Sequence, residues 1–571
     1  MDGRSSFHEA LSQASFNMDN AISFLFDSLK DRSTGKVELK SLFGIINNSG
    51  IELKDPRLAH FMTKISKVSK SEDKKQGLLM ENFSLDKDTF EYVFHENFTM
   101  LLKIVSNDFC IPRFSIFADS IGEIFEECRK FEGGENASYI PQLAEIDSKL
   151  WGCAVCTVDG QRTSFGDSNQ IFTLQSTSKP LTYALAITKY GSDYVHNYVG
   201  YEPSGHKFNM VILNENNKPH NPLINSGAIA VVSLLEKGLP LPERFVQIHK
   251  QISKMAGDSS LSFSNAIYLS ERSSADRNFS LAYYMREHKC YPEGTQLNDT
   301  LDLYFQLCSV EANCNSLSVI AACLANGGVN PITGERVLSG AAVRDTLSVM
   351  HSCGMYDYSG QFAFKVGLPC KSGVSGAIML VVPNLMGIAL YSPRLDKNGN
   401  SVRGIEFCQR LVEKFVFHNY ESQLHPVEKI DPRKVKYDDT HLSMVRVLYA
   451  AHHNDTVELR RCLIQNMDVS MKDYDDRSGL HIAASSGSYE AVEFFVEVAK
   501  LDINTRDRWN KTPLDDALTF GHEKISSYLK SKNAKLGSEL SIDSSGGDRK
   551  CVFNLDSLGE NIPDENTQGH V

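Results

Sequence analysis

The chain has 571 residues, of which 42% are hydrophobic and 23% are charged, and its formal net charge is -12. This composition is typical of a folded globular protein, and the length is too great for a single hydrophobic core, so several domains are expected. The acidic balance argues against nucleic acid or an anionic membrane as the main partner. The 13 cysteines follow no disulfide spacing and their number is odd, which favours a reducing, intracellular compartment.

The first residues carry no recognisable targeting signal. They contain no apolar core of a secretory signal, and the acidic residues Asp2, Glu9 and Asp19 are unlike an acid-poor transit peptide. A presequence is therefore not visible, and residues 1–19 are expected to be a flexible N-terminus.

Residues 20–132 are predicted to form a helical domain, because apolar residues recur there at helical spacing. The segment DRSTGKVEL within it resembles the loop of an EF-hand. If Gly35 takes the turn position of such a loop, Lys30 and Arg32 stand where calcium needs carboxylate ligands. We therefore expect an EF-hand-like domain that lacks calcium ligands. The sequence GGENAS at 133–138 marks its end.

Residues 139–424 are predicted to form the largest unit, an α+β domain with an antiparallel sheet flanked by helices. An Asp-Gly pair at 159–160 lies between alternating segments and predicts a β-hairpin. The most apolar stretch, 377–391, is interrupted by Pro383 and Asn384. This interruption predicts two buried strands joined by a turn, and no membrane span is expected.

Cys153 and Cys156 form a C-x-x-C motif inside an alternating apolar run. A zinc site needs further ligands, and no second cysteine pair stands at the required spacing. We therefore expect both cysteines to be ordinary strand residues, and we predict no metal site.

The last ordered region contains a repeat. The segment that starts at Ser478 recurs from Thr512, and Gly487 and Gly521 stand at the same offset of 34 residues, which is typical of ankyrin repeats. An irregular earlier copy near 445–454 supplies a third unit. We predict ankyrin repeats over 440–530, with an unidentified protein partner, and a disordered tail over 531–571, which is rich in Gly, Ser and Asp.

A serine and a lysine at the start of a predicted helix could carry chemistry. Ser176 and Lys179 are three residues apart, so they share one helix face. A serine hydroxyl needs a base, and a lysine can serve if burial or another cation lowers its pKa. This S-x-x-K pattern alone has little weight, because the chain contains three more copies. Its weight rises because Lys371 begins a K-S-G element like that of penicillin-recognising enzymes, and a cationic Lys371 would help to keep Lys179 neutral.

Several segments of the middle unit together resemble the glutaminase family. The helical, catalytic and ankyrin segments also follow the order found in the animal kidney- and liver-type enzymes, so the resemblance covers almost the full chain. The matching segments are Tyr139-Ile-Pro-Gln-Leu143, Gln175-Ser-Thr-Ser-Lys-Pro180, His220-Asn-Pro-Leu-Ile-Asn-Ser-Gly-Ala228, Ser270-Glu-Arg272, Asp276-Arg-Asn278, Met350-His-Ser-Cys-Gly-Met-Tyr356 and Lys371-Ser-Gly-Val374.

The resemblance implies a β-lactamase/transpeptidase-like catalytic fold and a reaction. L-glutamine would be hydrolysed to L-glutamate and ammonia through a glutamyl ester, without a cofactor. Ser176 would be the nucleophile, Lys179 its base, and Tyr356 the relay of a proton to the departing ammonia. The backbone amides of Ser176 and Val374 would form the oxyanion hole, and Lys371 would complete the catalytic set.

The resemblance also implies a substrate-binding set in which Glu271 suits the ammonium group of glutamine. Without the resemblance, the tyrosines of this set are more simply interpreted as core aromatics, the asparagines as caps and Glu271 as half of a surface ion pair. The set consists of Tyr139, Gln175, Ser176, Asn225, Glu271, Asn278, Tyr304, Tyr356 and Val374.

Regulation and location follow from the resemblance alone. It implies a homotetramer, possible activation by inorganic phosphate, and a mitochondrial location, with the cytosol as the alternative. Lys207, Arg277 and Tyr284 could form the phosphate site. Residues 206–214 resemble the activation loop of the animal enzymes. The kidney-type enzyme has a basic residue and an aromatic in this loop where this chain has Met210 and Ile212, which puts phosphate stimulation and inhibitor sensitivity in doubt.

Two other functions fit parts of the sequence. One is an S-x-x-K hydrolase of the β-lactamase or esterase type; Glu271 together with Asn225 and Asn278 argues against it, because these residues suit an α-amino acid and not a lactam. The other is an ankyrin scaffold with an inert enzyme-like domain. Against it, every matched catalytic position holds the required residue type, and few repeats make a small binding surface.

Overall fold

The computed structural model describes residues 18–31, 33–76, 83–205, 210–259, 261–421, 429–434, 438–464 and 467–540. The chain divides into two compact units, one of Met1–Ser443 with Arg460–Asp468 and one of Met444–Leu459 with Val469–Val571. The predicted flexible N-terminus, apart from its last two residues, and the predicted tail beyond residue 540 lie outside the described residues. In the part of the chain that is described, no helix is both long and apolar enough to cross a membrane.

The N-terminal helices form a small domain around their own apolar core, in which Phe90 and Phe94 stack at 3.7 Å. Two short strands pair antiparallel, with Val37 opposite Leu85, and Gly35 before them has a φ of +65°. The elements are α2 (Met18–Leu29), β1 (Val37–Glu38), α3 (Leu39–Asn48), η1 (Pro56–Leu58), α4 (Ala59–Gln76), β2 (Ser84–Leu85), α5 (Lys87–Phe94), η3 (His95–Asn97) and α6 (Phe98–Val105).

Helix α7 (Phe114–Cys128) departs from the predicted domain boundary at residue 132. Its apolar face belongs to the core of the catalytic sheet and not to the N-terminal domain. Phe125 stacks on Trp151 at 4.9 Å, and the Trp151 indole N–H donates to the Phe125 carbonyl. The helical period of α7 was visible in the sequence, but its partner is a strand start 26 residues later, which periodicity does not reveal.

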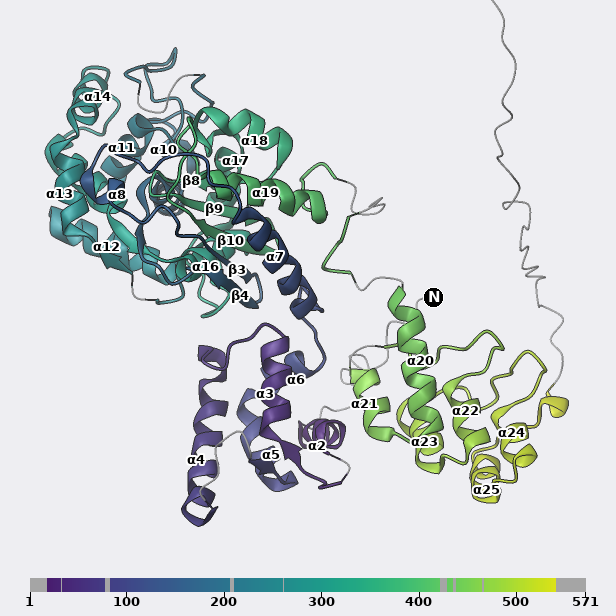
Figure 1. Cartoon of the computed structure of the whole chain (residues 1–571). Helices are drawn as coiled ribbons and strands as arrows, with labels where there is room; N and C mark the ends of the chain where they lie inside the picture. Colours follow the sequence, from purple (N-terminus) through teal and green to yellow (C-terminus); the bar gives the residue numbers. More distant parts are fainter. Residues whose placement is uncertain are drawn as a thin grey trace, which may run out of the picture. The chain divides into compact units, whose positions relative to one another are not determined.

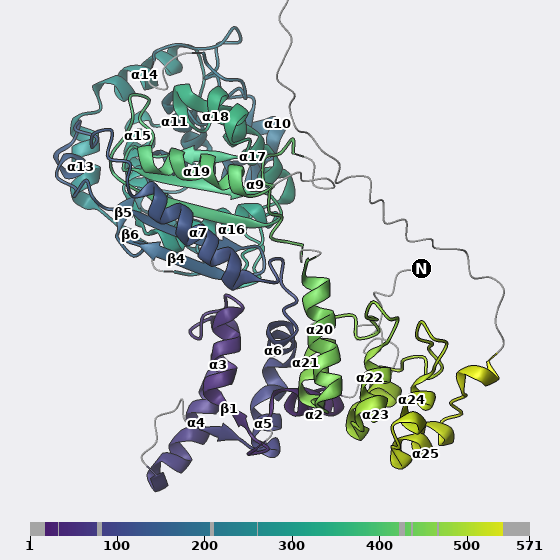
Figure 2. The ribbon, with the colours of Figure 1, turned by 45° about the vertical axis from the view of Figure 1, so that its right-hand side comes forward.

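The catalytic domain is built on a five-stranded antiparallel sheet with the order β4-β3-β10-β9-β8. Helices α7 and α19 (Val402–Lys414) cover one face, and α16 (Cys314–Ala325) packs against the other (Figures 1 and 2). Gly387 lets α16 approach, because a Cβ there would lie 2.2 Å from the Ala322 nitrogen. The strands are β3 (Gly152–Thr157), β4 (Arg162–Gly166), β8 (Cys370–Ser372), β9 (Ala377–Val382) and β10 (Met386–Tyr391).

This sheet confirms the predicted α+β architecture. The Asp-Gly pair joins β3 to β4, Cys153 and Cys156 lie in β3, and β9 and β10 are the two buried strands expected around Pro383. Asn384 in their turn has a φ of +60°, a conformation that asparagine tolerates well.

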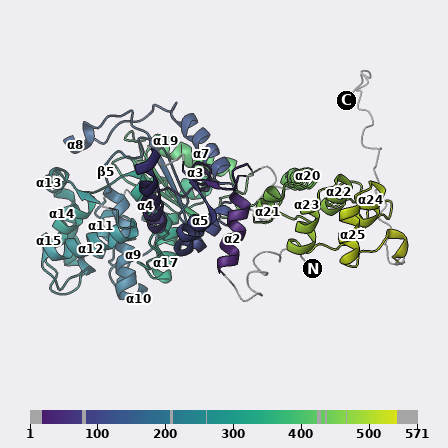
Figure 3. The same ribbon diagram turned by 90° about the horizontal axis from the view of Figure 1, so that it is seen from below.

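The remaining elements of the catalytic domain are mainly helices that surround the candidate site. Figure 3 shows α11, α14 and α15 packed beside one another at one end of this domain. The elements are α8 (Pro141–Ala144), β5 (Phe172–Thr173), η4 (Gln175–Thr177), α9 (Ser178–Tyr190), α10 (Ser192–Val195), α11 (Asn225–Leu234), α12 (Leu241–Met255), β6 (Ser262–Phe263), α13 (Asn265–Ser273), α14 (Asp276–Glu287), α15 (Leu297–Cys308), β7 (Val310–Ala312), α17 (Gly340–Cys353), η5 (Tyr356–Tyr358) and α18 (Ser359–Lys365).

The C-terminal helices show the predicted repeat in their caps. Ser478 and Thr512, 34 residues apart, each form a capping box with the residue three positions later. The reciprocal bonds satisfy the first helical N–H groups and so fix the same helix start in both repeats. The elements are α20 (Asp438–His452), α21 (Thr456–Ile464), α22 (Gly479–Ser486), α23 (Tyr489–Glu493), η6 (Phe494–Val498), α24 (Pro513–Thr519), α25 (Glu523–Ser531) and η7 (Gly537–Glu539).

Candidate active site

Ser176 lies in a tight turn between strand β5 and helix α9. The chain leaves β5, passes through the 3-10 turn η4, and becomes α-helical at Ser178, two residues later than predicted. Gln175 has a φ of +48°, which is uncommon for a residue with a Cβ and is typical of constrained functional turns. The Ser176 side chain is almost buried, at 9% exposed.

Strand β8 lies directly beside this turn, and Gly373 at its end makes the approach possible. A Cβ on Gly373 would stand 2.9 Å from the Leu174 carbonyl oxygen and 3.3 Å from the Thr177 methyl group. The K-S-G element is therefore brought against the S-x-x-K element, as the sequence predicted. The glycine is required because a larger residue would displace the turn that carries Ser176.

Lys179 is buried and hydrogen-bonded to an amide. Its side chain is 1% exposed, and Nζ donates to Asn225 Oδ1 at 2.6 Å. Burial lowers the pKa of Lys179 from 10.5 to about 8, against the opposing influence of Cys308 and Glu271. Asn225 in turn donates from Nδ2 to Asn278 Oδ1 at 3.0 Å, which fixes which end of its amide faces Lys179.

Lys371 lies near Lys179 but differs from its predicted role. It is fully buried, it donates to the Ser372 carbonyl at 2.6 Å, and its Nζ is 4.3 Å from the centre of the Tyr356 ring. Burial, followed by the charge of Lys179, holds the pKa of Lys371 well below its usual value. The prediction that a cationic Lys371 keeps Lys179 neutral therefore needs correction, since burial is the main cause of the low pKa of Lys179.

Tyr356 contacts the nucleophile from the turn η5, which follows helix α17. Its hydroxyl hydrogen-bonds the Ser176 hydroxyl, which opposes the strong rise in the pKa of Tyr356 that burial causes. Its backbone has a φ of +53° in the turn η5. A tyrosine in this conformation persists only where its surroundings hold it, and such strain is concentrated at functional sites.

A cavity of 390 Å³ opens beside Ser176 and gathers residues from four α-helices, from the turn η4 and from three connecting segments. Of the predicted substrate-binding residues, all except Tyr356 line it, and Tyr356 contacts Ser176 instead. The predicted residues in its walls are Tyr139, Gln175, Ser176, Asn225, Glu271, Asn278, Tyr304 and Val374.

Glu271 supplies a carboxylate inside this cavity. The Tyr139 hydroxyl donates to Glu271 Oε1, while the Tyr139 ring remains 47% exposed at the cavity edge. Burial raises the pKa of Glu271, and hydrogen bonds from Tyr139 and Gln175 oppose the rise. A half-buried carboxylate held in this way is a suitable partner for an ammonium group.

The cavity also contains residues that were not predicted to bind substrate. Cys308 lies one helical turn after Tyr304 on α15, so the spacing of four residues was an available signal. Ser274 and Ala275 lie between the two predicted residues Glu271 and Asn278 and also line the cavity.

Comparisons with known proteins agree with this geometry. The sequence profile of the glutaminase family matches residues 134–420, an EF-hand domain profile matches 21–112, and a profile of three ankyrin repeats matches 447–539. The mitochondrial liver isoform of glutaminase from Mus musculus is 48% identical over 84% of this chain and 79% of its own. A glutaminase from Nostoc is 44% identical over 53% of this chain and 89% of its own.

The chain belongs to the glutaminase family. A solved structure, Mglu in its native form, superposes with a TM-score of 0.50 at 38% identity and covers 54% of this chain and 74% of that one. Membership confirms the resemblance found in the sequence, including the fold class and the reaction. It also excludes the β-lactamase or esterase alternative for this glutaminase.

Two of the three residues predicted to bind phosphate, Arg277 and Tyr284, lie in the described part of this glutaminase, both on helix α14. Arg277 lines the same cavity as Ser176. Tyr284 lies seven residues later on α14, and its carbonyl oxygen is 3.0 Å from His288 Nδ1. Lys207 lies outside the described residues, so the three-residue site remains a prediction.

Gly373→Ala is expected to lower kcat by about 100-fold, because the added methyl group displaces the turn that positions Ser176. Gly340→Ala is the matched control, since a Cβ at Gly340 meets nothing within 4 Å. Steady-state kinetics and thermal unfolding of both variants check the prediction. Equal kcat values for the two would show that the close packing of Gly373 does not position the nucleophile.

Proposed function

We propose that this glutaminase hydrolyses L-glutamine to L-glutamate and ammonia with Ser176 as the nucleophile and Lys179 as its base. The observation that carries the assignment is the buried Lys179 amine, whose pKa falls to about 8, in the helix turn that follows a cavity-lining serine. An amine with a pKa near the working pH is an effective proton acceptor. The mechanism needs no cofactor.

The proposed reaction has two halves. In the first, Ser176 Oγ attacks the side-chain carbonyl of glutamine while its proton moves to Lys179. The C–N bond then breaks, Tyr356 delivers a proton to the leaving nitrogen, and ammonia departs from a glutamyl ester. In the second, water attacks the ester, and Ser176 recovers its proton as glutamate leaves. The backbone N–H groups of Ser176 and Val374 are proposed to stabilise the oxyanion in both halves.

Substrate recognition is proposed to rest on charge and size. Glu271 accepts the α-ammonium group of glutamine, and the amides of Asn225 and Asn278 together with the Tyr304 hydroxyl contact its polar backbone end. The cavity of 390 Å³ lies at the small end of the range for ligand sites, which suits a free amino acid better than a peptide.

Ser176→Ala is expected to lower kcat by about 10⁴-fold or more, since the variant has no atom that can form the ester. Glutamate and ammonia release are measured together with the thermal unfolding temperature. Ser33→Ala is the matched control, because Ser33 belongs to another S-x-x-K copy and is exposed in the N-terminal domain. Ammonia release from Ser176→Ala at the rate of the control would overturn the proposed nucleophile.

Asn225 is proposed to orient the base as well as to contact substrate. Its amide oxygen accepts the Lys179 N–H at 2.6 Å and carries no formal charge, so it fixes the amine without the ion pair that a carboxylate would form. A carboxylate at the same place would form an ion pair and raise the pKa of Lys179. Asn278, which accepts from Asn225, keeps the amide from flipping.

In the pH profile of kcat/KM, the midpoint of the acidic limb lies near pH 8 for the parent enzyme. Asn225→Asp is expected to raise this midpoint by about one pH unit or more. The sign follows because the base must be neutral, and a higher pKa keeps it protonated to a higher pH. Asn533→Asp, an exposed position in the ankyrin unit, is the control. If KM changed but the midpoint of the acidic limb did not, Asn225 would contact substrate without orienting the base.

Assembly into a homotetramer is proposed from the family resemblance and from an exposed aromatic pair. Phe364 and Tyr420 are 86% and 84% exposed, and His418 Nε2 lies 3.2 Å from the Phe364 carbonyl oxygen, so both rings belong to one surface region. Large exposed aromatics close together are typical of interaction surfaces. Phosphate is proposed as an activator through Arg277, with Lys207 and Tyr284 as further contacts.

Light scattering of the parent protein is expected to give four times the mass of one chain. Phe364→Ser is expected to lower the measured mass, because an apolar contact between subunits is lost. Tyr474→Ser, at an 88% exposed position in the ankyrin unit, is the control. Phosphate titration of the activity in the same samples tests the activator. A monomeric parent would contradict the assembly, and a flat titration would contradict activation.

The ankyrin repeats are proposed to bind a protein partner, and the chain is proposed to act in mitochondria. Ankyrin repeats stack into a surface suited to protein binding. The Mus musculus relative is named as a mitochondrial isoform. Fractionation of cells that express the chain tests the location, and recovery in the cytosol alone would contradict it.

A further inference from the structure

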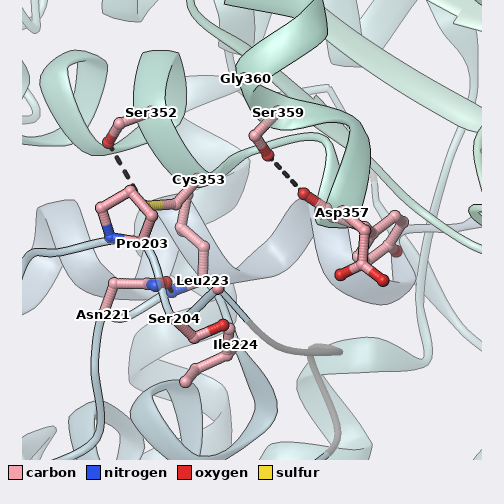
Figure 4. A pocket seen from close by; sticks show the side chains of 12 residues that line it. Pro203, Ser204, Asn221, Leu223, Ile224, Ser352, Cys353, Asp357, Ser359 and Gly360 are labelled. Atoms are coloured by element: carbon pink, nitrogen blue, oxygen red, sulfur yellow. Dashed lines mark hydrogen bonds between the residues drawn. The ribbon is translucent and has the colours of Figure 1, made fainter. Parts of the chain in front are cut away.

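The 390 Å³ cavity beside Ser176 is called the glutamine cavity from here on. A second cavity, of 290 Å³, lies against Tyr356 and shares no lining residue with it. Figure 4 shows its walls: Ser352 and Cys353 at the end of α17 and Ser359 and Gly360 at the start of α18 lie on one side. The other side is formed by loop residues before α11, which are Pro203, Ser204, Gly205, Asn221, Leu223 and Ile224. We name it the Tyr356 cavity.

Tyr356 separates this cavity from the nucleophile. Its side chain lines the Tyr356 cavity, while its buried hydroxyl hydrogen-bonds Ser176, which lines the glutamine cavity. The tyrosine is held from its backbone, because the Ser359 hydroxyl donates to the Tyr356 carbonyl at 2.7 Å. Tyr356 is therefore the residue through which the two cavities are in contact.

The chemistry of the walls selects for small neutral or cationic species. Asp357 is the one charged residue among the lining residues, and the remaining polar groups are serine hydroxyls, an asparagine amide and the Cys353 thiol. An anion such as glutamate or phosphate needs cationic partners, which these walls do not provide. Ammonia, ammonium and water meet no such obstacle, and carboxylate and hydroxyl oxygens can accept their N–H and O–H groups.

The reaction requires two small molecules to pass while the glutamine cavity is full. After the ester forms, the glutamyl group still occupies that cavity, with its ammonium group on Glu271. Ammonia must then leave from the side of Tyr356, which protonates it, and a water molecule must reach the ester carbon. A route back through the glutamine cavity would be blocked by the acyl group itself.

We propose that the Tyr356 cavity receives the leaving ammonia and supplies the hydrolytic water. As the C–N bond breaks, the nitrogen takes the Tyr356 proton, and the tyrosine regains a proton from Lys179. Ammonia passes Tyr356 into the cavity, where Asp357 favours its conversion to ammonium. Water moves the opposite way and attacks the ester while its proton passes to Lys179. As the C–O bond breaks, Ser176 Oγ takes that proton back from Lys179 and leaves as the restored hydroxyl, and glutamate is released. This inference rests on the proposed roles of Ser176, Lys179 and Tyr356.

Gly360→Leu tests the proposal by adding an apolar side chain at a position that lines the cavity. A Cβ at Gly360 meets nothing within 4 Å, so the new side chain is tolerated by the backbone around it. Gly340→Leu is the matched control, because Gly340 also begins a helix, is exposed, has a free Cβ position and lines neither cavity. Both variants are assayed for kcat, KM and, after acid quenching, for the mass of a glutamyl ester on the intact chain.

Gly360→Leu is expected to lower kcat by about tenfold, equivalent to about 1.4 kcal/mol in the deacylation barrier, without raising KM. The glutamyl ester should accumulate on this variant and not on the control. Asp357→Asn supplies a second measurement: inhibition by ammonium chloride, compared with sodium chloride at equal ionic strength, should weaken several-fold.

Kinetics of Gly360→Leu equal to those of Gly340→Leu would overturn the proposal, as would a raised KM with no accumulated ester. Unchanged ammonium inhibition in Asp357→Asn would remove the role of Asp357 in the passage. Failure of the Ser-Lys mechanism is distinguishable, because Ser176→Ala would then retain activity. If Ser176→Ala is inactive and Gly360→Leu resembles its control, only the cavity proposal falls.

Discussion

The exclusion of water from the Lys179 amine is the constraint on which the rest of this active site depends. A lysine loses its charge near neutral pH only if the protein withholds water from it and offers no carboxylate partner at hydrogen-bonding distance. Helix α9 meets the first condition, because every residue from Ser178 to Ile187 is buried. The Asn225 amide, which carries no formal charge, accepts the amine N–H at 2.6 Å.

A strained backbone supports this chemistry. Gln175 and Tyr356, on either side of the Ser176 hydroxyl, both have positive φ values, of +48° and +53°. Close packing holds them there: Gly373 allows β8 to touch the Ser176 turn, and Lys371 lies over the Tyr356 ring. The local strain is offset by the buried sheet and helices around it, as is common where side chains must be held in place for a reaction.

The sequence predicted those parts of the molecule that local pattern determines. The β3–β4 hairpin, the two strands around Pro383 and the repeat caps at Ser478 and Thr512 all follow from short segments. Family resemblance then placed the substrate residues that line the glutamine cavity. These agreements arise because turn chemistry, alternation and motif spacing act over a few residues.

Contacts between distant segments could not be predicted in the same way. The bond from Lys179 to Asn225 spans 46 residues, α7 contributes its apolar face to the core that contains Trp151, and burial of Lys371 removes its expected role as a cation. The Tyr356 cavity is formed by three separate segments. Each depends on tertiary packing, which overrides what a single segment indicates.

The most direct test of the account is the titration of Lys179 itself. NMR of the protein with ¹³C-labelled lysine side chains, with the Lys179 signal assigned by its loss in Lys179→Arg, follows the Cε shift against pH without any turnover. Burial of the Lys179 amine predicts a midpoint near 8. A midpoint near the ordinary lysine value of about 10.4 would show that the amine is charged in the resting enzyme, and would contradict its role as the base.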